Sequence, residues 1–554
     1  MPPITSPHSL FGADPTAAPL AESAGESQSG YCFLYPDLAQ REDVGCFTGR
    51  PAALSFKHLQ AFEAASRGPL SAPQVLPMRL PAVYTYFGQF VNHDISAPVG
   101  DVVTPASPPE GVGVITDTSP PGLDRSDRAA PEVILGSFLN EQANPLALDS
   151  LYGDGGPDST DPDIRALYAP DRKRFRLGLT RVEDPQVFVN KRKNPARVIH
   201  ATGAPDILRK DGKPLIADHR NDENLIISQL HLALMLFHNK AVAALEPKFP
   251  DAAKCFAEAR HLVTLHYHWL ILNDFLPKLL SPKALQTPLA QRPQKLPAAR
   301  TVPLEFTTAA FRFGHSMVGA AYDFNANFGR GGRVERDGAS LIELFTFTTH
   351  RNMGHPDKPT LQLPDHWVID WERITRAPRP TPGPGGAERI DLTFAPDMLN
   401  VMGSSDIAVH GSILFRNLMR GFQRRIAFGQ ELAKACGLDA MKPEEVRAAL
   451  PDVNPARPGE KSLREIAEQM DMLTQTPAWL YFLCEARHFE QGERLGPVAS
   501  DIIADTFVGL LRHMPQSILN HAGGSWHPRK SPLRSAGGRS LTSIRALLKC
   551  AVAK

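Results

Sequence analysis

The chain has 554 residues, 42% of them hydrophobic and 21% charged, and its 60 Lys and Arg residues balance 59 Asp and Glu residues to a formal charge of +1. This profile is typical of a soluble globular protein that can enclose a large apolar cofactor. The even charge excludes bulk affinity for nucleic acid or for a membrane surface. No run of about 18 uncharged apolar residues occurs, so no integral membrane segment is expected.

The candidate elements are mostly helical and are separated by loops rich in proline and glycine. Residues 1–30 are expected to be a flexible segment, residues 31–520 one large catalytic domain, and residues 521–554 a basic C-terminal tail. Long loops are expected at 97–131 and 376–389. Apolar residues at helical spacing predict helices at 84–94, 223–245, 252–276, 308–321, 407–421, 499–511 and 540–552. Since alternating strand patterns are scarce, the sequence predicts a mainly α fold.

The cysteines and the N-terminal residues indicate the compartment. None of the six cysteines forms a CxxC pair, so a zinc or iron–sulfur site built on cysteine is not expected. Reduced thiols are the expectation, with a Cys32–Cys46 bridge left open. The first residues lack a basic start followed by an apolar run, which is the pattern of a secretory signal. The cytoplasm is therefore the expected location, with export by another route left open.

The first polar cluster lies in the helix expected at 84–94. Gln89 and His93 are four residues apart and share one helix face. A histidine beside an amide can move protons near neutral pH. Taken alone, a histidine in an apolar helix also fits a hydrogen-bonded core residue.

The second cluster, Asp218 to Asn224, opens the long helix expected at 223–245. Asp222 or Asn221 is expected to cap this helix. Arg220, directly before a buried helix, can reach into a pocket and stabilise developing negative charge.

Two further clusters occur later in the chain. In Phe311–Ser316, a glycine precedes His315 and lets a flat group approach closely, and Arg312 can pair with a carboxylate. In Arg416–Gly421, Asn417 can accept a hydrogen bond from a metal-bound histidine, and Arg420 can bind a second carboxylate.

Together these segments resemble the haem peroxidases of the animal (myeloperoxidase–cyclooxygenase) type. The matching stretches are TYFGQFVNHDIS, HRNDENLIISQLHLALMLFHN, FRFGHSM and RNLMRG, in that order, with further similarity in LPDHWVIDW and ERLGPVASDIIADTFVGLL. They span roughly residues 75–520. Four ordered motifs are far more specific than any one of them.

The resemblance implies a haem b cofactor and a role for each matching residue. His315 is implied as the axial iron ligand, with Asn417 hydrogen-bonded to its other ring nitrogen. His93 and Arg220 are implied as the residues that cleave the O–O bond of hydrogen peroxide, and Gln89 as a residue that positions water or a small anion. Arg312 and Arg420 are implied partners of the haem propionates. The expected co-substrate is a small organic electron donor or a halide.

The chain departs from the family pattern at the positions that tether haem and bind calcium. Asn92 stands where relatives have an ester-forming Asp, whereas Glu223 occupies the second ester position, so at most one covalent link is expected. The implied calcium ligands that remain are Asp94, Asp149 and Ser150, while Ala147 replaces an Asp that relatives often carry.

Two other functions stay open at this stage. One is a fatty-acid dioxygenase of the same superfamily, although Arg312 stands where those enzymes carry a radical-forming Tyr. The other is a non-enzymatic haem-binding protein, which would need neither His93 nor Arg220. The paired histidines 266/268 and 231/238 are interpreted as core residues, and the glycines at 329–332 as a turn.

Overall fold

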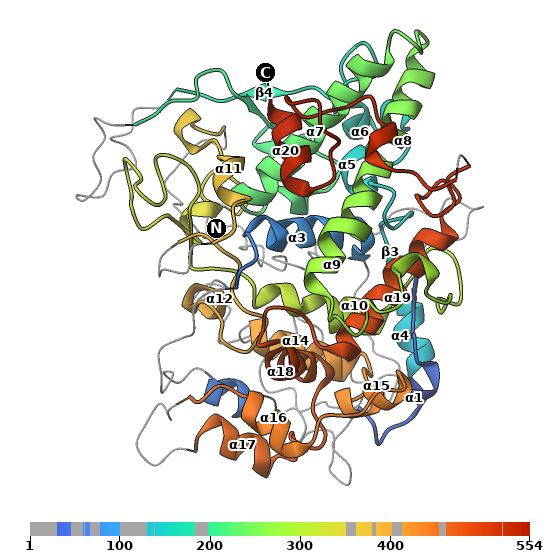
Figure 1. Ribbon diagram of the computed structural model, residues 1–554, viewed down its shortest axis with the longest axis vertical. Helices are drawn as coiled ribbons and strands as arrows, with labels where there is room; N and C mark the ends of the chain where they lie inside the picture. The colour runs from blue at the N-terminus through green and yellow to red at the C-terminus, as the bar shows by residue number, and fades with distance from the viewer. Residues whose placement is uncertain are drawn as a thin grey trace.

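The computed structural model describes residues 30–45, 59, 61–66, 78–99, 130–137, 139–182, 198–350, 362–378, 384–400, 413–453, 461–522 and 524–553. Helices dominate this part of the chain, and its strands form five two-stranded sheets (Figure 1). One sheet joins the beginning of the described chain to its middle, because β1 (Gly30–Cys32) pairs in parallel with β8 (Thr301–Pro303). The prediction of a mainly α fold is confirmed. Cys32 is buried, and Cys46 lies outside the described residues.

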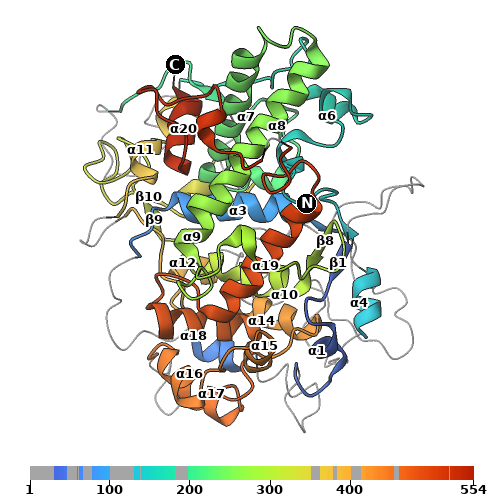
Figure 2. The same cartoon turned by 45° about the vertical axis from the view of Figure 1, so that its right-hand side comes forward.

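A single short helix crosses the middle of the molecule. This helix, α3 (Val83–Ile95), is buried along its whole length and corresponds to the helix predicted at 84–94. It packs against α7 (Leu225–Leu245) on one side and against the short helix η7 (Ala310–His315) on another. Figures 1 and 2 both show α3 in the centre, with helices above and below it. Its polar side chains therefore lie inside the protein.

The helix α7 begins at Leu225, and its cap differs from the prediction. Asn224 caps it by accepting hydrogen bonds from the backbone N–H groups of Ile226 and Ile227. The expected cap, Asp222 or Asn221, is wrong, because both lie one turn earlier in the 3₁₀-helix η4 (His219–Asp222). Asp222 instead forms a two-pronged ion pair with Arg209, at 2.7 and 2.8 Å.

The long apolar segments after Glu223 form the upper half of the core. α8 (Ala252–Leu270) packs on α7, and its path continues through a π-helical turn (Ile271–Phe275) into α9 (Leu276–Leu279). The helix α20 (Ile544–Val552), near the C-terminus, also packs on α7. α7 is long and apolar enough to span a membrane, but 83% of its apolar window is buried inside the protein, as in a core helix.

The helix predicted at 308–321 is wrong in type and length. The chain forms the 3₁₀-helix η7, in which Arg312 N–H donates to Ala309 O and Ser316 N–H donates to Phe313 O. The preceding α10 (Leu304–Thr308) ends at Ala309, whose φ of −128° is not helical. A 3₁₀ turn has three residues per turn, so the apolar spacing that suggested an α-helix does not determine the local geometry.

Helices from the C-terminal third form the lower half of the molecule (Figure 2). α14 (Ile413–Gln423) and α19 (Pro497–His513) confirm the helices predicted near 407–421 and 499–511, and residues 407–412 lie outside the described part. Both pack against α18 (Ala478–Glu490), which in turn contacts η7. The remaining described α-helices are α1 (Pro36–Gln40), α4 (Pro131–Ser137), α5 (Asp149–Tyr152), α6 (Pro162–Ala166), α11 (Trp371–Ile374), α12 (Pro396–Asn400), α15 (Gly429–Ala435), α16 (Pro443–Ala449) and α17 (Leu463–Gln469).

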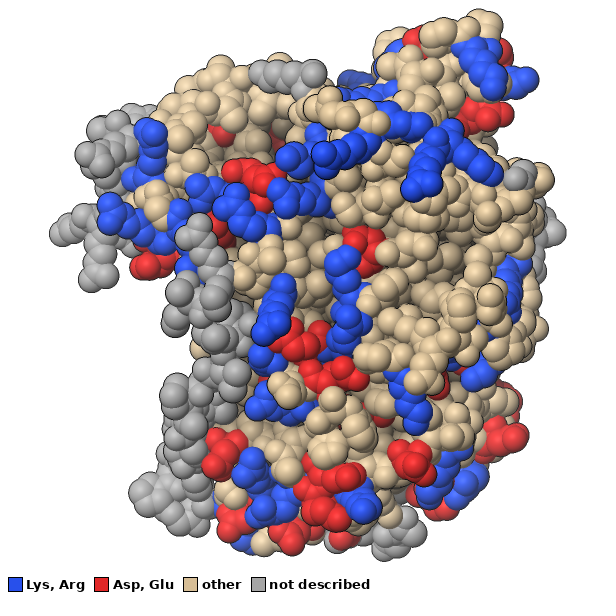
Figure 3. Space-filling view, in the orientation of Figure 1, with Lys and Arg blue, Asp and Glu red and all other residues tan. Residues whose placement is uncertain are grey.

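The surface carries charges of both signs. On the face shown in Figure 3, acidic and basic side chains alternate over the lower half, and Lys and Arg predominate across the upper part.

The interpretation of His266 and His268 as core residues agrees with their contacts. His266 is hydrogen-bonded to the Ser531 side chain, and His268 is hydrogen-bonded to the Leu146 carbonyl.

Candidate active site

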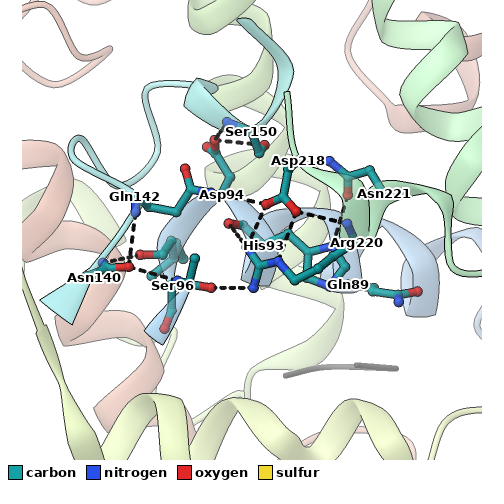
Figure 4. A network of polar contacts seen from close by, with 12 residues as sticks. Gln89, His93, Asp94, Ser96, Asn140, Gln142, Ser150, Asp218, Arg220 and Asn221 are labelled. Atoms are coloured by element: carbon teal, nitrogen blue, oxygen red, sulfur yellow. Dashed lines mark hydrogen bonds and ion pairs between the residues drawn. The ribbon is translucent and has the colours of Figure 1, made fainter. Parts of the chain in front are cut away.

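His93 lies near the C-terminal end of α3 and is fully buried. Its Nδ1 is 2.9 Å from Oδ1 of Asn221 (Figure 4). An amide oxygen only accepts hydrogen bonds, so Nδ1 carries the proton and Nε2 carries the lone pair. Nε2 is buried and has no hydrogen-bond partner among the described residues. Burial, together with the charge of Arg220, lowers the pKa of His93 to about 3, which keeps the ring neutral.

Arg220 lies beside His93 and is held by four hydrogen-bond acceptors. Its Nε and Nη2 donate to the two carboxylate oxygens of Asp218, at 2.9 and 2.6 Å. Nη2 also donates to the His93 carbonyl at 2.9 Å, and Nη1 donates to the Ser96 carbonyl at 2.8 Å. Figure 4 shows the guanidinium group between Asp218 and the end of α3. These contacts tie the start of α7 to the helix that carries His93.

Gln89 connects the same helix to the two residues that precede α7. Its Nε2 donates to Oε2 of Glu223 at 3.1 Å, and its Oε1 accepts from Nδ2 of Asn224 at 3.3 Å. Burial raises the pKa of Glu223 well above its usual value. Burial therefore favours the neutral, protonated form of the Glu223 carboxyl group.

His315 ends η7 and is also buried, with its Nδ1 3.0 Å from the Asn417 side-chain amide on α14. In this orientation Nδ2 faces the ring, and the Asn417 Oδ1 is buried with no hydrogen-bond partner in the described part of the chain. The two ends of an amide are interchangeable by a 180° turn. After that turn Oδ1 accepts from a protonated Nδ1, which leaves Nε2 of His315 as the ring nitrogen with a lone pair. In that turned orientation, Asn417 favours on His315 the same tautomer that Asn221 favours on His93.

Two buried arginines lie near His315. Burial is the first cause that lowers the pKa of His315 well below its usual value, and the positive charges of Arg312 and Arg420 lower it further. Nε of Arg312 donates to the Thr307 carbonyl at 2.8 Å. The neighbourhood of His315 is therefore buried and positively charged, which suits a ligand with carboxylates.

The predicted site residues form two groups on elements that touch. One group contains two hydrogen-bonded pairs, Arg220 with His93 and Gln89 with Glu223, and α3 carries a member of each pair. The other group is His315 with Asn417. The packing of α3 on η7 brings the two elements together, and Oγ1 of Thr85 donates to the Met317 carbonyl at 3.4 Å.

The candidate calcium ligands also lie together, but N–H groups contact them. Asp94 accepts hydrogen bonds from Leu148 N–H and from both N–H and Oγ–H of Ser150. Asp149 accepts from Nη2 of Arg260 at 2.8 Å. Burial and the nearby Asp149 raise the pKa of Asp94 to about 7. Calcium requires six or more oxygen ligands, and here donors and a guanidinium occupy these carboxylates, so the residues do not fit the ion in this arrangement.

Sequence reasoning missed two residues of the site. It treated Asn221 only as a candidate helix cap and gave Asp218 no role, whereas Asp218 forms an ion pair with Arg220 and Asn221 is hydrogen-bonded to His93. Both residues flank Arg220 within the same short motif. The sequence signal for both residues was the cluster of polar residues directly before a buried helix. A single helix cap requires fewer polar residues than this cluster contains.

Comparison with known proteins identifies the family. Residues 172–356 match the family model described as animal haem peroxidase, a stretch that holds Arg220, Glu223 and His315. Mouse (Mus musculus) thyroid peroxidase is 24% identical over 352 residues, which cover 59% of this chain and 34% of that protein. The mouse peroxidasin homolog is 25% identical over 201 residues, 34% of this chain and 13% of that protein. The chain thus spans about a third of the thyroid peroxidase that it matches.

Two solved structures have the same fold. Peroxidase A from Dictyostelium discoideum superposes with a TM-score of 0.51 at 16% identity, covering 89% of this chain and 90% of that one. The fatty acid alpha-dioxygenase of Oryza sativa gives 0.52 at 12% identity, covering 88% and 76%. The chain contains a stretch, residues 172–356, that matches the animal haem peroxidase family. The prediction made from the four motifs is confirmed.

The match to the animal haem peroxidase family implies haem binding, and the residues present fit that group. Two neutral histidines come from touching elements, and each has its Nδ1 fixed by an asparagine. The buried lone pair of the His93 Nε2 has no partner among the residues that the structure describes, as expected for an atom that faces a bound ligand. The buried cations Arg312 and Arg420 match the carboxylates of a porphyrin.

Proposed function

We propose that the chain is a haem-dependent peroxidase that reduces hydrogen peroxide while it oxidises a small organic donor or an easily oxidised halide. The observation that carries this proposal is the state of His93. Its ring is neutral, its Nδ1 is bound to Asn221, and its Nε2 is a buried lone pair without a protein partner next to Arg220. A non-enzymatic haem carrier would need neither that base nor the fixed cation beside it.

His93 and Arg220 have different roles in the cleavage of the O–O bond, namely proton transfer and charge stabilisation. The haem, when bound, would supply an iron that binds peroxide and stores the two oxidising equivalents that peroxide delivers until the donor reduces it. Nε2 of His93 takes the proton from the inner peroxide oxygen and returns it to the outer one, which leaves as water. Arg220, oriented by Asp218, stabilises the negative charge that develops on the departing oxygen. Gln89, on the same face of α3, positions water or a small anion.

When haem is bound, His315 would hold its iron through Nε2. The hydrogen bond between its Nδ1 and Asn417 fixes the ring orientation and the tautomer. The amide is a neutral acceptor, so the proposed ligand is a neutral imidazole. Arg312 and Arg420 are proposed to bind the propionates.

Glu223 is the one proposed point of covalent attachment. Its carboxyl group is buried beside Gln89, whereas Asn92 cannot form the family's other ester. At most one ester is therefore proposed. With fewer links the haem is expected to be less oxidising, and chloride is not a proposed substrate.

Lipid dioxygenation by a tyrosyl radical is the competing function within the superfamily. It is disfavoured because the residue three before His315 is Arg312, a buried cation near that ring. Peroxide-independent oxygen uptake with linoleate would support that function instead.

The test is peroxide turnover with guaiacol by the purified holoprotein and its His93→Ala variant. We expect the variant to keep its haem and to lose about 100- to 10,000-fold in rate. The matched control is His266→Gln, another buried histidine, whose contact is Ser531. It should retain its rate per haem. A holoprotein that leaves guaiacol untouched, or a His93→Ala variant with full turnover, contradicts the proposal.

A further inference from the structure

A second group of metal-binding side chains lies outside the proposed active site. His200, Asp365 and His366 each offer a ligand atom, and these three atoms lie within 4.8 Å of one another. Nδ1 of His200 is 2.8 Å from Oδ1 of Asp365, and Nδ1 of His366 is 3.8 Å from the same oxygen. It is the one group of three or more such side chains found among the described residues.

The backbone around this group is firmly held. The His366 carbonyl accepts from the side-chain amides of Asn325 and Asn327, both at 3.0 Å. The next residue, Trp367, stacks on Phe328 with ring centroids 3.8 Å apart. Rigid support of this kind favours a preformed site, because little ordering is left to the binding step.

The same segment is anchored to the core helix α7. Nε2 of Gln229 donates to the Trp367 carbonyl, and Ile369 N–H donates to the Gln229 Oε1. Ile199, the neighbour of His200, is in turn bonded through both N–H and carbonyl to the Asn327 side chain. Two segments about 165 residues apart are therefore fixed against each other.

The chemistry of the three side chains is that of a metal site. The Asp365 side chain is 0% exposed, and its other oxygen accepts from Oγ1 of Thr202 at 3.3 Å. Two imidazoles and a carboxylate are ligands for zinc and similar borderline ions.

One side of the group is open. Asp365 and His366 line a cavity of about 410 Å³ that α11 and α20 also border, through Trp371 and Lys549 among others. These two helices lie side by side in both ribbon views (Figures 1 and 2). His200 is 34% exposed. Water can therefore reach the three ligands and complete a four-coordinate shell.

We propose that His200, Asp365 and His366 bind one divalent transition-metal ion of the zinc class, separate from the haem iron. The ion would join the chain near residue 200 to the chain near residue 366, and exchangeable water would occupy its open side. Its role would be to tie these two segments together on α7. The proposal is independent of peroxide turnover.

Zinc titration of the holoprotein tests the site. The protein is washed with EDTA, which leaves haem in place, and then titrated with zinc chloride by calorimetry. We expect one zinc per chain with a dissociation constant of about 1 μM or tighter. Saturation should also raise the melting temperature, because the ion binds only the folded chain.

Two variants and a control locate the bound ion. His200→Ala removes a half-exposed ligand, and Asp365→Asn keeps the shape but removes the charge, so each should weaken zinc binding at least about tenfold. The control His488→Ala removes another half-exposed histidine, which lies 3.8 Å from Glu445. It should bind zinc as the unaltered protein does. The proposal is overturned if the unaltered protein takes up no zinc, or if either ligand variant, with its far-ultraviolet spectrum intact, binds zinc normally.

Discussion

Asp218 holds Arg220 by a two-pronged ion pair whose N···O distances are 2.9 and 2.6 Å. The remaining donors of Arg220 point to carbonyls at the end of α3, including that of His93. Burial acts to raise the pKa of Asp218, but the charge and hydrogen bonds of Arg220 outweigh it and hold that pKa at about 2. The cation proposed to act on peroxide is thus fixed relative to the proposed base.

Asp218→Asn should slow peroxide reduction about 10- to 100-fold while the haem absorption spectrum stays unchanged. The amide cannot offer two charged acceptors, so the guanidinium loses its fixed orientation. Stopped-flow measurement of the rate constant with hydrogen peroxide checks this. Asp323→Asn is the control, because it breaks the pair of Asp323 with Arg373, away from the site. Equal losses in both variants would mean that the effect is general destabilisation.

The rate constant with peroxide should stay flat from about pH 8 down to about pH 4 and fall below that. A base must be unprotonated to act, and burial lowers the pKa of His93 to about 3. The same shift affects the free energy of unfolding. The pKa of His93 in the folded chain is below its ordinary value of 6.5. The contribution of His93 to stability is therefore complete above pH 6.5 and is lost as the pH falls toward 3. A pH–rate profile over this range is the measurement. An inflection near 6.5 would show that His93 is solvated and contradict the described geometry.

Mass spectrometry of tryptic peptides should find haem either free or on the single peptide that contains Glu223. Glu223 is the one carboxyl group at the two tethering positions, because the other is Asn92. In Glu223→Gln, acidified butanone should extract all of the haem. Haem attached to any other peptide, or retained by the variant, would contradict this assignment.

Calcium should not stabilise the protein. Asp94 is occupied by N–H and O–H donors and Asp149 by Arg260, so the ion would have to displace a guanidinium. The melting temperature of EDTA-washed holoprotein should therefore respond equally to millimolar calcium and magnesium. A rise specific to calcium that disappears in Asp94→Asn would reinstate the calcium site.

The sequence predicted the parts of the fold in which local pattern and burial agree. α3, α7 and α19 are apolar helices, and their periodicity alone is enough to place them. The segment with His315 was misassigned because a 3₁₀-helix is chosen by its packing between neighbours, not by apolar spacing.

Within the site, residue types were easier to predict than partners. The pairing of His93 with Asn221 spans 128 residues, and that of His315 with Asn417 spans 102. Only the second was inferred beforehand, through the family resemblance. The pairing of His200 with Asp365 leaves no trace in local sequence, because neither residue belongs to a short ligand motif.

The central claim is that Nε2 of His315 binds haem iron, and ligand rescue tests it most directly. The optical and electron paramagnetic resonance spectra of the holoprotein are compared with those of His315→Gly, before and after addition of imidazole. We predict that the variant loses the histidine-ligated spectrum, and that imidazole restores it by filling the space of the missing ring. His315→Gly with a spectrum identical to that of the unaltered holoprotein would contradict the account.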